Sequence, residues 1–174
     1  MAALLDSRVH AEMQAQFGNR ERLLATIGKY FSTMHQRVTI ICKKRFLDRF
    51  VSFSTLPADF AVLCLAMHLI IHQPATPPVS MMSQTYGNLK SLIGLLEASE
   101  SLTIEVVQSK ILCATYELGH GILAAASMSV AACARVARLI GLQPRRQERT
   151  QDDVDTLQAE ESSRACWALA NLER

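Results

Sequence analysis

The fold class of this chain is decided by residues Ser101 to Gln143, SLTIEVVQSKILCATYELGHGILAAASMSVAACARVARLIGLQ. The stretch predicts two helices joined by a turn at Gly119 and Gly121, because glycine adopts the left-handed backbone that ends a helix. The second half, from Ile122 to Ala134, has no charged residue and predicts a central helix that is buried on most sides. The first half predicts one apolar helix face, made of Ile104, Val107, Ile111, Cys113, Ala114 and Leu118.

Helical periodicity also runs through most of the remaining chain. One short stretch, residues 37–41, is β-branched and predicts an extended connection. The helix expected over 43–53 has charged residues that should face solvent. The other predicted helices cover residues 2–16, 20–34, 57–71, 81–98 and 160–174. The sequence therefore predicts a single all-α domain over residues 1–174, with about seven helices in an antiparallel array and no significant β-sheet.

Two segments predict connections without regular structure. Residues 73–80, QPATPPVS, form a proline-rich connection, because each proline removes a backbone donor and extends the residue before it. Residues 143–159 are polar and carry charges of both signs, which predicts a solvated loop. The arginines of this loop are accompanied by four acidic residues, so a phosphate-binding patch is not favoured there.

Composition limits the classes of function. The chain is 49% hydrophobic and 20% charged, which is typical of a globular domain with a real core. Its net charge of +2 is too small to indicate nucleic acid or an anionic membrane as a partner. The five cysteines include no CxxC pair, so no structural zinc module is expected and a reducing compartment is indicated. The longest apolar run, Phe60 to Ile71, is too short to cross a bilayer.

Several motifs of this chain occur together, in the same order, in one known family. The runs are KYFSTMHQRVTII, VQSKILCATYELGHG, CARVARLIGLQ and EESSRACWALANLER. They resemble the middle homology region of fungal zinc-cluster transcription factors, the fungal-specific transcription factor domain. The resemblance covers about residues 20–174 and corresponds to the N-terminal part of that region. The matching positions are Tyr30, Phe31, His35, Val107, Gln108, Tyr116, Gly121, Arg135, Ala137, Gly141, Leu142, Glu161, Arg164, Trp167, Leu172 and Arg174.

The chain departs from the family pattern at four positions. Thr39 stands where proline is common, Cys133 where alanine is usual, Gln143 where histidine is usual, and Glu173 where aspartate is usual. The resemblance implies a regulatory and interaction domain of a transcription regulator in the nucleus. Expected partners are other proteins or the rest of a longer regulator, with a small-molecule effector also compatible with the family.

The family reads DNA through a zinc cluster of six cysteines that precedes this region. The resemblance therefore implies that these residues hold no cofactor themselves, that zinc belongs to an upstream module, and that this chain makes no direct contact with nucleic acid. No membrane partner is expected either. A helical-repeat interaction scaffold unrelated to transcription is the alternative. A repeat should recur with a period of about 34 residues, and only one such helix pair is visible in the sequence, which disfavours this alternative.

A few cysteines and histidines could bind a metal ion or act in catalysis, or could simply belong to the core. Cys64, His68 and His72 fall at i, i+4 and i+8 on one predicted helix and could offer three ligands to zinc. A core role is favoured because Asp59 is the only nearby acid and a fourth ligand is missing. His120 has neither an oxyanion donor nor an activating acid beside it, so the sequence predicts no enzyme.

The last predicted helix carries an apolar flank that includes Trp167, Leu169 and Leu172. Other helices should leave part of this flank, and part of the alanine-rich helix that begins at Ile122, exposed, and exposed apolar surface generally marks an interface. The chain is therefore expected either to self-associate or to need additional chain or a partner. The alternative is that Trp167 packs into a groove left by the first helix, residues 2–16.

Overall fold

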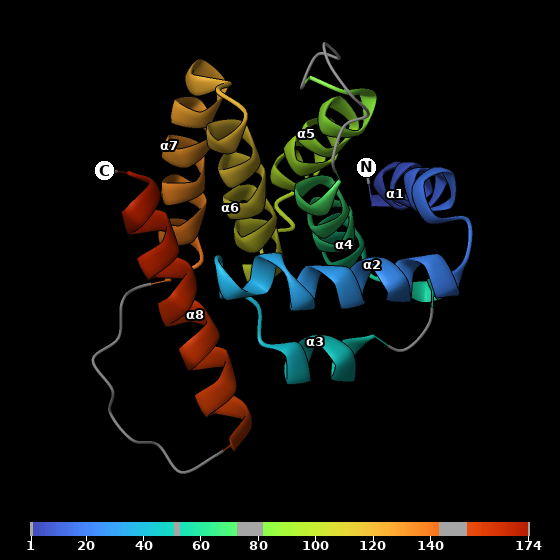
Figure 1. The fold of residues 1–174 in the computed structure, drawn as a ribbon, viewed down its shortest axis with the longest axis horizontal. Helices are drawn as coiled ribbons and strands as arrows, with labels where there is room; N and C mark the ends of the chain where they lie inside the picture. The colour runs from blue at the N-terminus through green and yellow to red at the C-terminus, as the bar shows by residue number, and fades with distance from the viewer. Residues whose placement is uncertain (1, 51–52, 73–81, 143–152, 174) are drawn as a thin grey trace.

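The computed structural model describes residues 2–50, 53–72, 82–142 and 153–173. Over these residues it contains helices and no strand, which confirms the predicted all-α class. There are eight α-helices where about seven were predicted, and two short 3₁₀ helices at Met34–Gln36 and Phe53–Thr55. The α-helices are α1 (Ala2–Phe17), α2 (Arg20–Ser32), α3 (Lys43–Arg49), α4 (Ala58–Ile71), α5 (Gln84–Ala98), α6 (Ile104–Gly119), α7 (Leu123–Leu139) and α8 (Asp153–Leu172) (Figure 1).

Helices α4 and α6 form the centre of the molecule. α4 contacts α1, α2, α5 and α6, while α6 also contacts α7 and α8. Every residue of α4 from Phe60 to Met67 is buried, as expected for a helix that is apolar on all sides. Among the described residues, no helix combines the length and the apolar character needed to cross a membrane.

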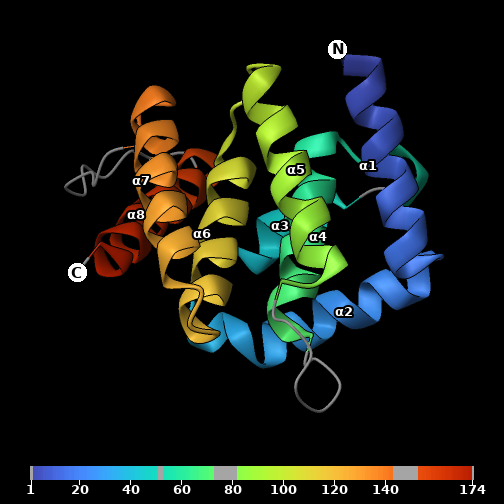
Figure 2. The ribbon, with the colours of Figure 1, turned by 90° about the horizontal axis from the view of Figure 1, so that it is seen from above.

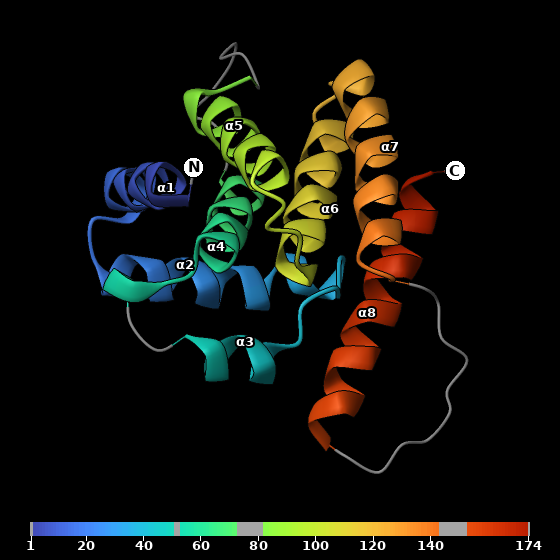
Figure 3. The same cartoon turned by 180° about the vertical axis from the view of Figure 1, so that it is seen from behind.

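The remaining helices surround this pair in two orientations. Helices α4 to α7 stand side by side, and α2 runs across one end of them with α3 beneath it (Figures 1 and 3). α1 packs on the opposite flank from α7, against α4 and α5, as the view from above shows (Figure 2). α8 packs against α6 and α7. Polar residues of α3, α6 and α8 are thereby brought to one corner of the molecule.

The predicted glycine turns are present. Gly121 follows α6 with a φ of +73°, and Gly141 follows α7 with a φ of +71°. Side chains other than glycine rarely adopt this left-handed backbone, which explains why these two positions end their helices. The two amide hydrogen bonds that close the first turn are Gly121 N to Leu118 O and Ile122 N to Glu117 O, at 3.2 and 2.9 Å.

Helix α6 is buried more completely than its apolar pattern predicts. Its residues from Ile104 to Ala114 are all buried, and these include Glu105, Gln108, Ser109 and Lys110. The prediction of a single apolar face is therefore wrong, and Leu118, assigned to that face, is 40% exposed. Glu105, Gln108 and Lys110 are buried because α3, α8 and α5 supply partners for them, and Ser109 Oγ donates to the carbonyl of Glu105 on the preceding turn.

Helix α7 is not the central helix that its uncharged sequence predicts. One face packs against α6 through Ala126, Val130, Cys133 and Ala137, whereas the opposite face is open. The side chains of Leu123, Met128 and Leu139 are 66%, 75% and 74% exposed. The absence of charge from Ile122 to Ala134 therefore reflects an apolar outer surface as well as an apolar contact with the core.

This difference between the two faces of α7 predicts that one type of substitution has a large effect on stability at one face and a small effect at the other. Ala126→Leu should lower the free energy of unfolding by about 1 to 3 kcal/mol, because Ala126 is fully buried and the added atoms overpack the α6 contact. Ala131→Leu, at an exposed position, should change it by less than about 0.5 kcal/mol. Chemical denaturation measures both. Equal effects would contradict the placement of α7 at the edge.

Several predicted boundaries differ from the structure. The helix expected over 43–53 ends at Arg49, and that expected over 20–34 ends at Ser32 before the 3₁₀ turn. The polar loop predicted over 143–159 is wrong for 153–159, because α8 already begins at Asp153. Residues 143–152 and the predicted connection 73–80 lie outside the described residues.

Candidate interaction site

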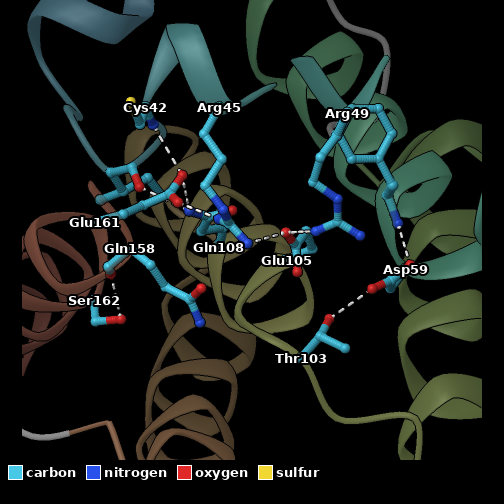
Figure 4. Close-up of polar contacts among 12 residues, drawn as sticks. Cys42, Arg45, Arg49, Asp59, Thr103, Glu105, Gln108, Gln158, Glu161 and Ser162 are labelled. Carbon is cyan, nitrogen blue, oxygen red and sulfur yellow. Dashed lines mark hydrogen bonds and ion pairs between the residues drawn. The ribbon is translucent and has the colours of Figure 1, made fainter. Parts of the chain in front are cut away.

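A buried polar network joins α3, α6 and α8 at one corner of the molecule (Figure 4). Its centre is the carboxylate of Glu161, a residue only 3% exposed. This carboxylate accepts hydrogen bonds from the backbone N–H of Cys42 at 2.9 Å and from Gln108 Nε2 at 2.8 Å. It is also paired with the guanidinium of Arg45. α8 is thereby tied both to α6 and to the chain just before α3.

A second carboxylate extends the network along α3. Glu105, at the start of α6, pairs with Arg45 at 3.1 Å and with Arg49. Gln108 Nε2 also donates to the carbonyl of Ile40 at 2.8 Å. A buried charge is tolerated only when it is paired and hydrogen-bonded, and both carboxylates meet that condition. The network therefore fixes the position of α3 and α8 relative to α6.

Two positions of the family resemblance, Gln108 and Glu161, meet in this network although 53 residues separate them in sequence. The sequence identified both residues by resemblance alone. It missed Arg45, Arg49 and Glu105, because charged residues of an amphipathic helix are normally solvated. The sequence signal that could have indicated this network is the charge of Glu105 within an otherwise apolar helix start.

The positions Tyr30, Phe31 and His35 lie in an aromatic cluster close to the network. Tyr30 is fully buried, its hydroxyl donates to the carbonyl of Val38 at 3.4 Å, and burial raises the pKa of its phenol. Phe31 contacts Tyr30, His35 and Phe46 edge to face, with ring centroids 5.4, 5.1 and 5.8 Å apart. These residues pack the end of α2 onto α3 and have a structural role.

A second polar cluster lies between α5, α6 and α7. Glu117, which is fully buried, accepts a hydrogen bond from Tyr86 at 2.6 Å and pairs with Lys90 at 3.0 Å. Lys90 also donates to Ser129 Oγ at 2.7 Å. Tyr116, a position of the resemblance, stacks on Tyr86 with ring centroids 5.9 Å apart. The sequence did not predict this cluster, because its members come from three separate helices.

Of the other positions of the resemblance, Val107 and Ala137 are buried in the core, and several more lie on the surface or at helix ends. Arg135 is exposed, Leu142 packs against the core, and Arg164 pairs with Glu160 on the surface of α8. Trp167 is 62% exposed, and α8 packs against α6 and α7, so packing of Trp167 into a groove beside α1 is wrong. Arg174 lies outside the described residues.

The suggested zinc ligands do not form a metal site. Cys64 is fully buried among core residues, and burial raises the pKa of its thiol. His68 packs edge to face on Phe17 with ring centroids 5.3 Å apart, and His72 lies 5.4 Å from His68. Within the part of the chain that the structure describes, no three His, Cys, Asp or Glu side chains gather closely enough to bind a metal ion.

Cys113 and His120 do not have the chemistry of a nucleophile and a base. His120 Nδ1 lies 2.7 Å from the carbonyl of Tyr116 on the preceding turn. Burial and the nearby Glu117 carboxylate raise the pKa of the Cys113 thiol to about 12. A thiolate is the reactive form of cysteine, and this environment disfavours it.

Comparison with known proteins gives a relative with similar sequence. The chain is 35% identical over 122 residues to Transcription factor BOA15 of Botryotinia fuckeliana. The chain is similar to a transcription factor. The match covers 67% of this chain and 65% of that protein, so the chain spans slightly less than two thirds of the relative's length. No protein-family model matches the chain, and no solved structure matches it. The similarity supports a protein of the transcription-factor type.

Two half-buried histidines, His35 and His68, predict a dependence of stability on pH. Burial, followed by neighbouring positive charge, lowers the pKa of His35 and of His68, and Nδ1 of each ring is buried without a hydrogen-bond partner. The unfolded chain therefore binds protons more readily, so stability should fall as the pH drops below about 6.5.

Urea midpoints between pH 7.5 and pH 5.5 measure this effect. His68→Phe keeps an aromatic ring against Phe17 but cannot be protonated, so the variant should lose less stability on acidification than the wild type. His10→Phe changes an exposed residue and serves as the control. An unchanged acid sensitivity in the His68→Phe protein would contradict the assignment of the effect to His68.

Proposed function

We propose that this chain is a regulatory and protein-interaction domain of a fungal zinc-cluster type of transcription regulator, acting in the nucleus. The observation that carries the proposal is the 35% identity to a transcription factor over 122 residues. The family motifs give further support, because Gln108 and Glu161 hold one network together. The same similarity supports a protein that is not an enzyme.

The roles of the positive side chains favour protein contacts over DNA. Arg45, Arg49, Lys90 and Lys110 are each paired with a glutamate, so their charges are neutralised within the fold. A DNA-binding surface needs several cations directed at phosphates. We therefore propose that these residues bind no nucleic acid and hold no zinc, and that DNA contact belongs to a separate zinc-cluster module, as in the family.

The packing gives no support to a helical-repeat scaffold. In a repeat protein each unit contacts its sequence neighbours only. Here α4 contacts α1, α2, α5 and α6, and α6 contacts helices on both sides in sequence. The central helices thus gather distant segments around one core, as a globular domain does.

A tethering experiment tests the proposed function. Residues 1–174 fused to an unrelated DNA-binding module should change expression of a reporter gene that carries the module's binding site. The module alone is the control, and circular dichroism of the fusion establishes that the domain is folded. Reporter expression equal to that of the module alone would contradict a regulatory role.

We expect the unfused chain to show no sequence-specific binding to duplex DNA at physiological salt. The physical reason is the small net charge of +2, together with the pairing of Arg45, Arg49 and Lys90 with glutamates of the same chain. Sequence-specific binding can be measured by an electrophoretic mobility shift assay on a pool of random duplexes. The shifted duplexes are selected and sequenced. Enrichment of one sequence with nanomolar affinity would contradict the expectation.

A further inference from the structure

The most exposed large apolar side chains of α7 gather on its outer side. We define the α7 outer face as Leu123, Met128, Ala131, Arg135, Arg138 and Leu139, all of which are exposed. A single exposed leucine is ordinary on a protein surface, but three large apolar residues that are each two thirds or more exposed on one 17-residue helix are not.

Helix geometry makes these residues one continuous surface. At about 100° per residue they fall within an arc of about 160° centred on Ala131. Leu123 and Leu139 are 16 residues apart, which corresponds to about 24 Å along the helix axis. Ala131 at the middle allows close approach, while the larger side chains stand on either side. The surface therefore matches the length and width of a second helix of about four turns.

The charges on this face have one sign. Arg135 and Arg138 are exposed, and neither has an ion-pair partner among the described residues. The whole of α7 contains no aspartate or glutamate. By contrast, the exposed Arg164 of α8 pairs with Glu160 on its own helix. The α7 outer face thus presents apolar surface with positive charge that nothing described in the fold neutralises.

We propose that the α7 outer face binds an acidic amphipathic helix of a partner protein. Apolar side chains of that helix would cover Leu123, Met128 and Leu139, and its aspartates or glutamates would pair with Arg135 and Arg138. Helix-in-groove recognition uses such a pattern of apolar anchors with charged flanks. The inference rests on the proposed function, to which it adds the surface and the chemistry of the partner.

A second copy of this chain is a poorer occupant of the same face. A two-fold contact requires that the surface be complementary to itself. Pairing α7 with α7 would bring four arginines and no carboxylate into one interface, because the helix has no acidic residue. Like charges within an interface oppose association. The charge pattern therefore selects an acidic partner.

The test uses two designed probe peptides and the whole chain. Both peptides are 18-residue helices with leucines along one stripe, flanked by glutamates in the first and by lysines in the second. Fluorescence anisotropy should show that the wild type binds the glutamate peptide at least tenfold more tightly than the lysine peptide. Raising the salt concentration should weaken that binding, because exposed ion pairs are screened.

Charge-reversed variants locate the surface. Replacing Arg135 and Arg138 by glutamate should reverse the preference, so that the lysine peptide binds more tightly. Arg22→Glu with Lys44→Glu, at exposed positions on α2 and α3, makes the same change in net charge and should leave the preference intact. Circular dichroism establishes that both double variants are folded.

Three results would overturn the inference. These are failure of the folded wild type to bind the glutamate peptide, equal binding of the two peptides, and light scattering that shows a dimer abolished by Met128→Glu. The last result would assign the face to a second copy. The reporter experiment tests the proposed function separately. If the fusion changes reporter expression but the chain binds neither peptide, this inference is wrong and the proposed function still stands.

Discussion

Glu161→Ala is expected to lower the free energy of unfolding by about 3 kcal/mol. The substitution leaves Arg45 with one carboxylate partner fewer and removes the acceptor of the Cys42 N–H group and of Gln108. Breaking a buried ion pair costs about 3 to 5 kcal/mol, and the 20% exposure of the Arg45 side chain places this case at the low end. Urea denaturation followed by circular dichroism gives the value.

The neighbouring residue provides a matched control. Glu160 pairs with Arg164 on the same helix, but these side chains are 52% and 38% exposed. Glu160→Ala should therefore change the free energy of unfolding by less than about 1 kcal/mol. If the two alanine variants were equally stable, Glu161 would not be the residue that ties α8 to the domain. Glu161→Gln should fall between them, because an amide keeps an acceptor but loses the charge.

Leu63→Ala is expected to have an effect of similar or greater size, about 3 to 5 kcal/mol. Leu63 is 1% exposed in the middle of α4, where every neighbour in the helix is also buried. The alanine variant loses the transfer free energy of the removed atoms and leaves a cavity that close packing prevents from collapsing. A domain of this size should lose about 10 °C in melting temperature for that change.

A leucine-to-alanine substitution at an exposed position of α7 shows whether the loss of stability comes from burial or from the residue type. Leu123 is 66% exposed, so Leu123→Ala should alter the free energy of unfolding by about 0.5 kcal/mol or less. Scanning calorimetry on the two variants makes the comparison directly. A melting temperature that drops equally in both would mean that α4 is no more central than α7.

Helix positions could be predicted from the sequence because they depend on local information. The three- and four-residue spacing, the two turn glycines and Pro57 all act within a few residues of the helix they define. α6, for example, begins at Ile104 and reaches Gly119, close to its predicted limits. Burial is different, since it depends on what packs against a helix. α7 looked central because uncharged residues suit both a core and an outer binding face.

The polar network could be predicted only in part, and through resemblance rather than physics. Gln108 and Glu161 matched family positions, but nothing local shows that their side chains meet. Arg45 and Arg49 were expected in solvent, yet both reach Glu105, about 60 residues further along the chain. A pairing at that separation leaves no periodic signal, so the charged residues of an amphipathic helix and those of a buried network look alike in sequence.

The span of the Glu161 network has a consequence for how the protein is made. The hydrogen bond from Cys42 to Glu161 joins residues 119 positions apart, so Glu161 leaves the ribosome well after Cys42. Chains are synthesised at about 5 to 20 residues per second, so Cys42 and Gln108 wait for seconds before their acceptor exists. During that interval Glu105 can already pair with both arginines, because all three residues precede α7. Ribosome-bound chains that stop before Glu161 should consequently be cleaved by protease near Cys42, and chains long enough to expose α8 should be protected there.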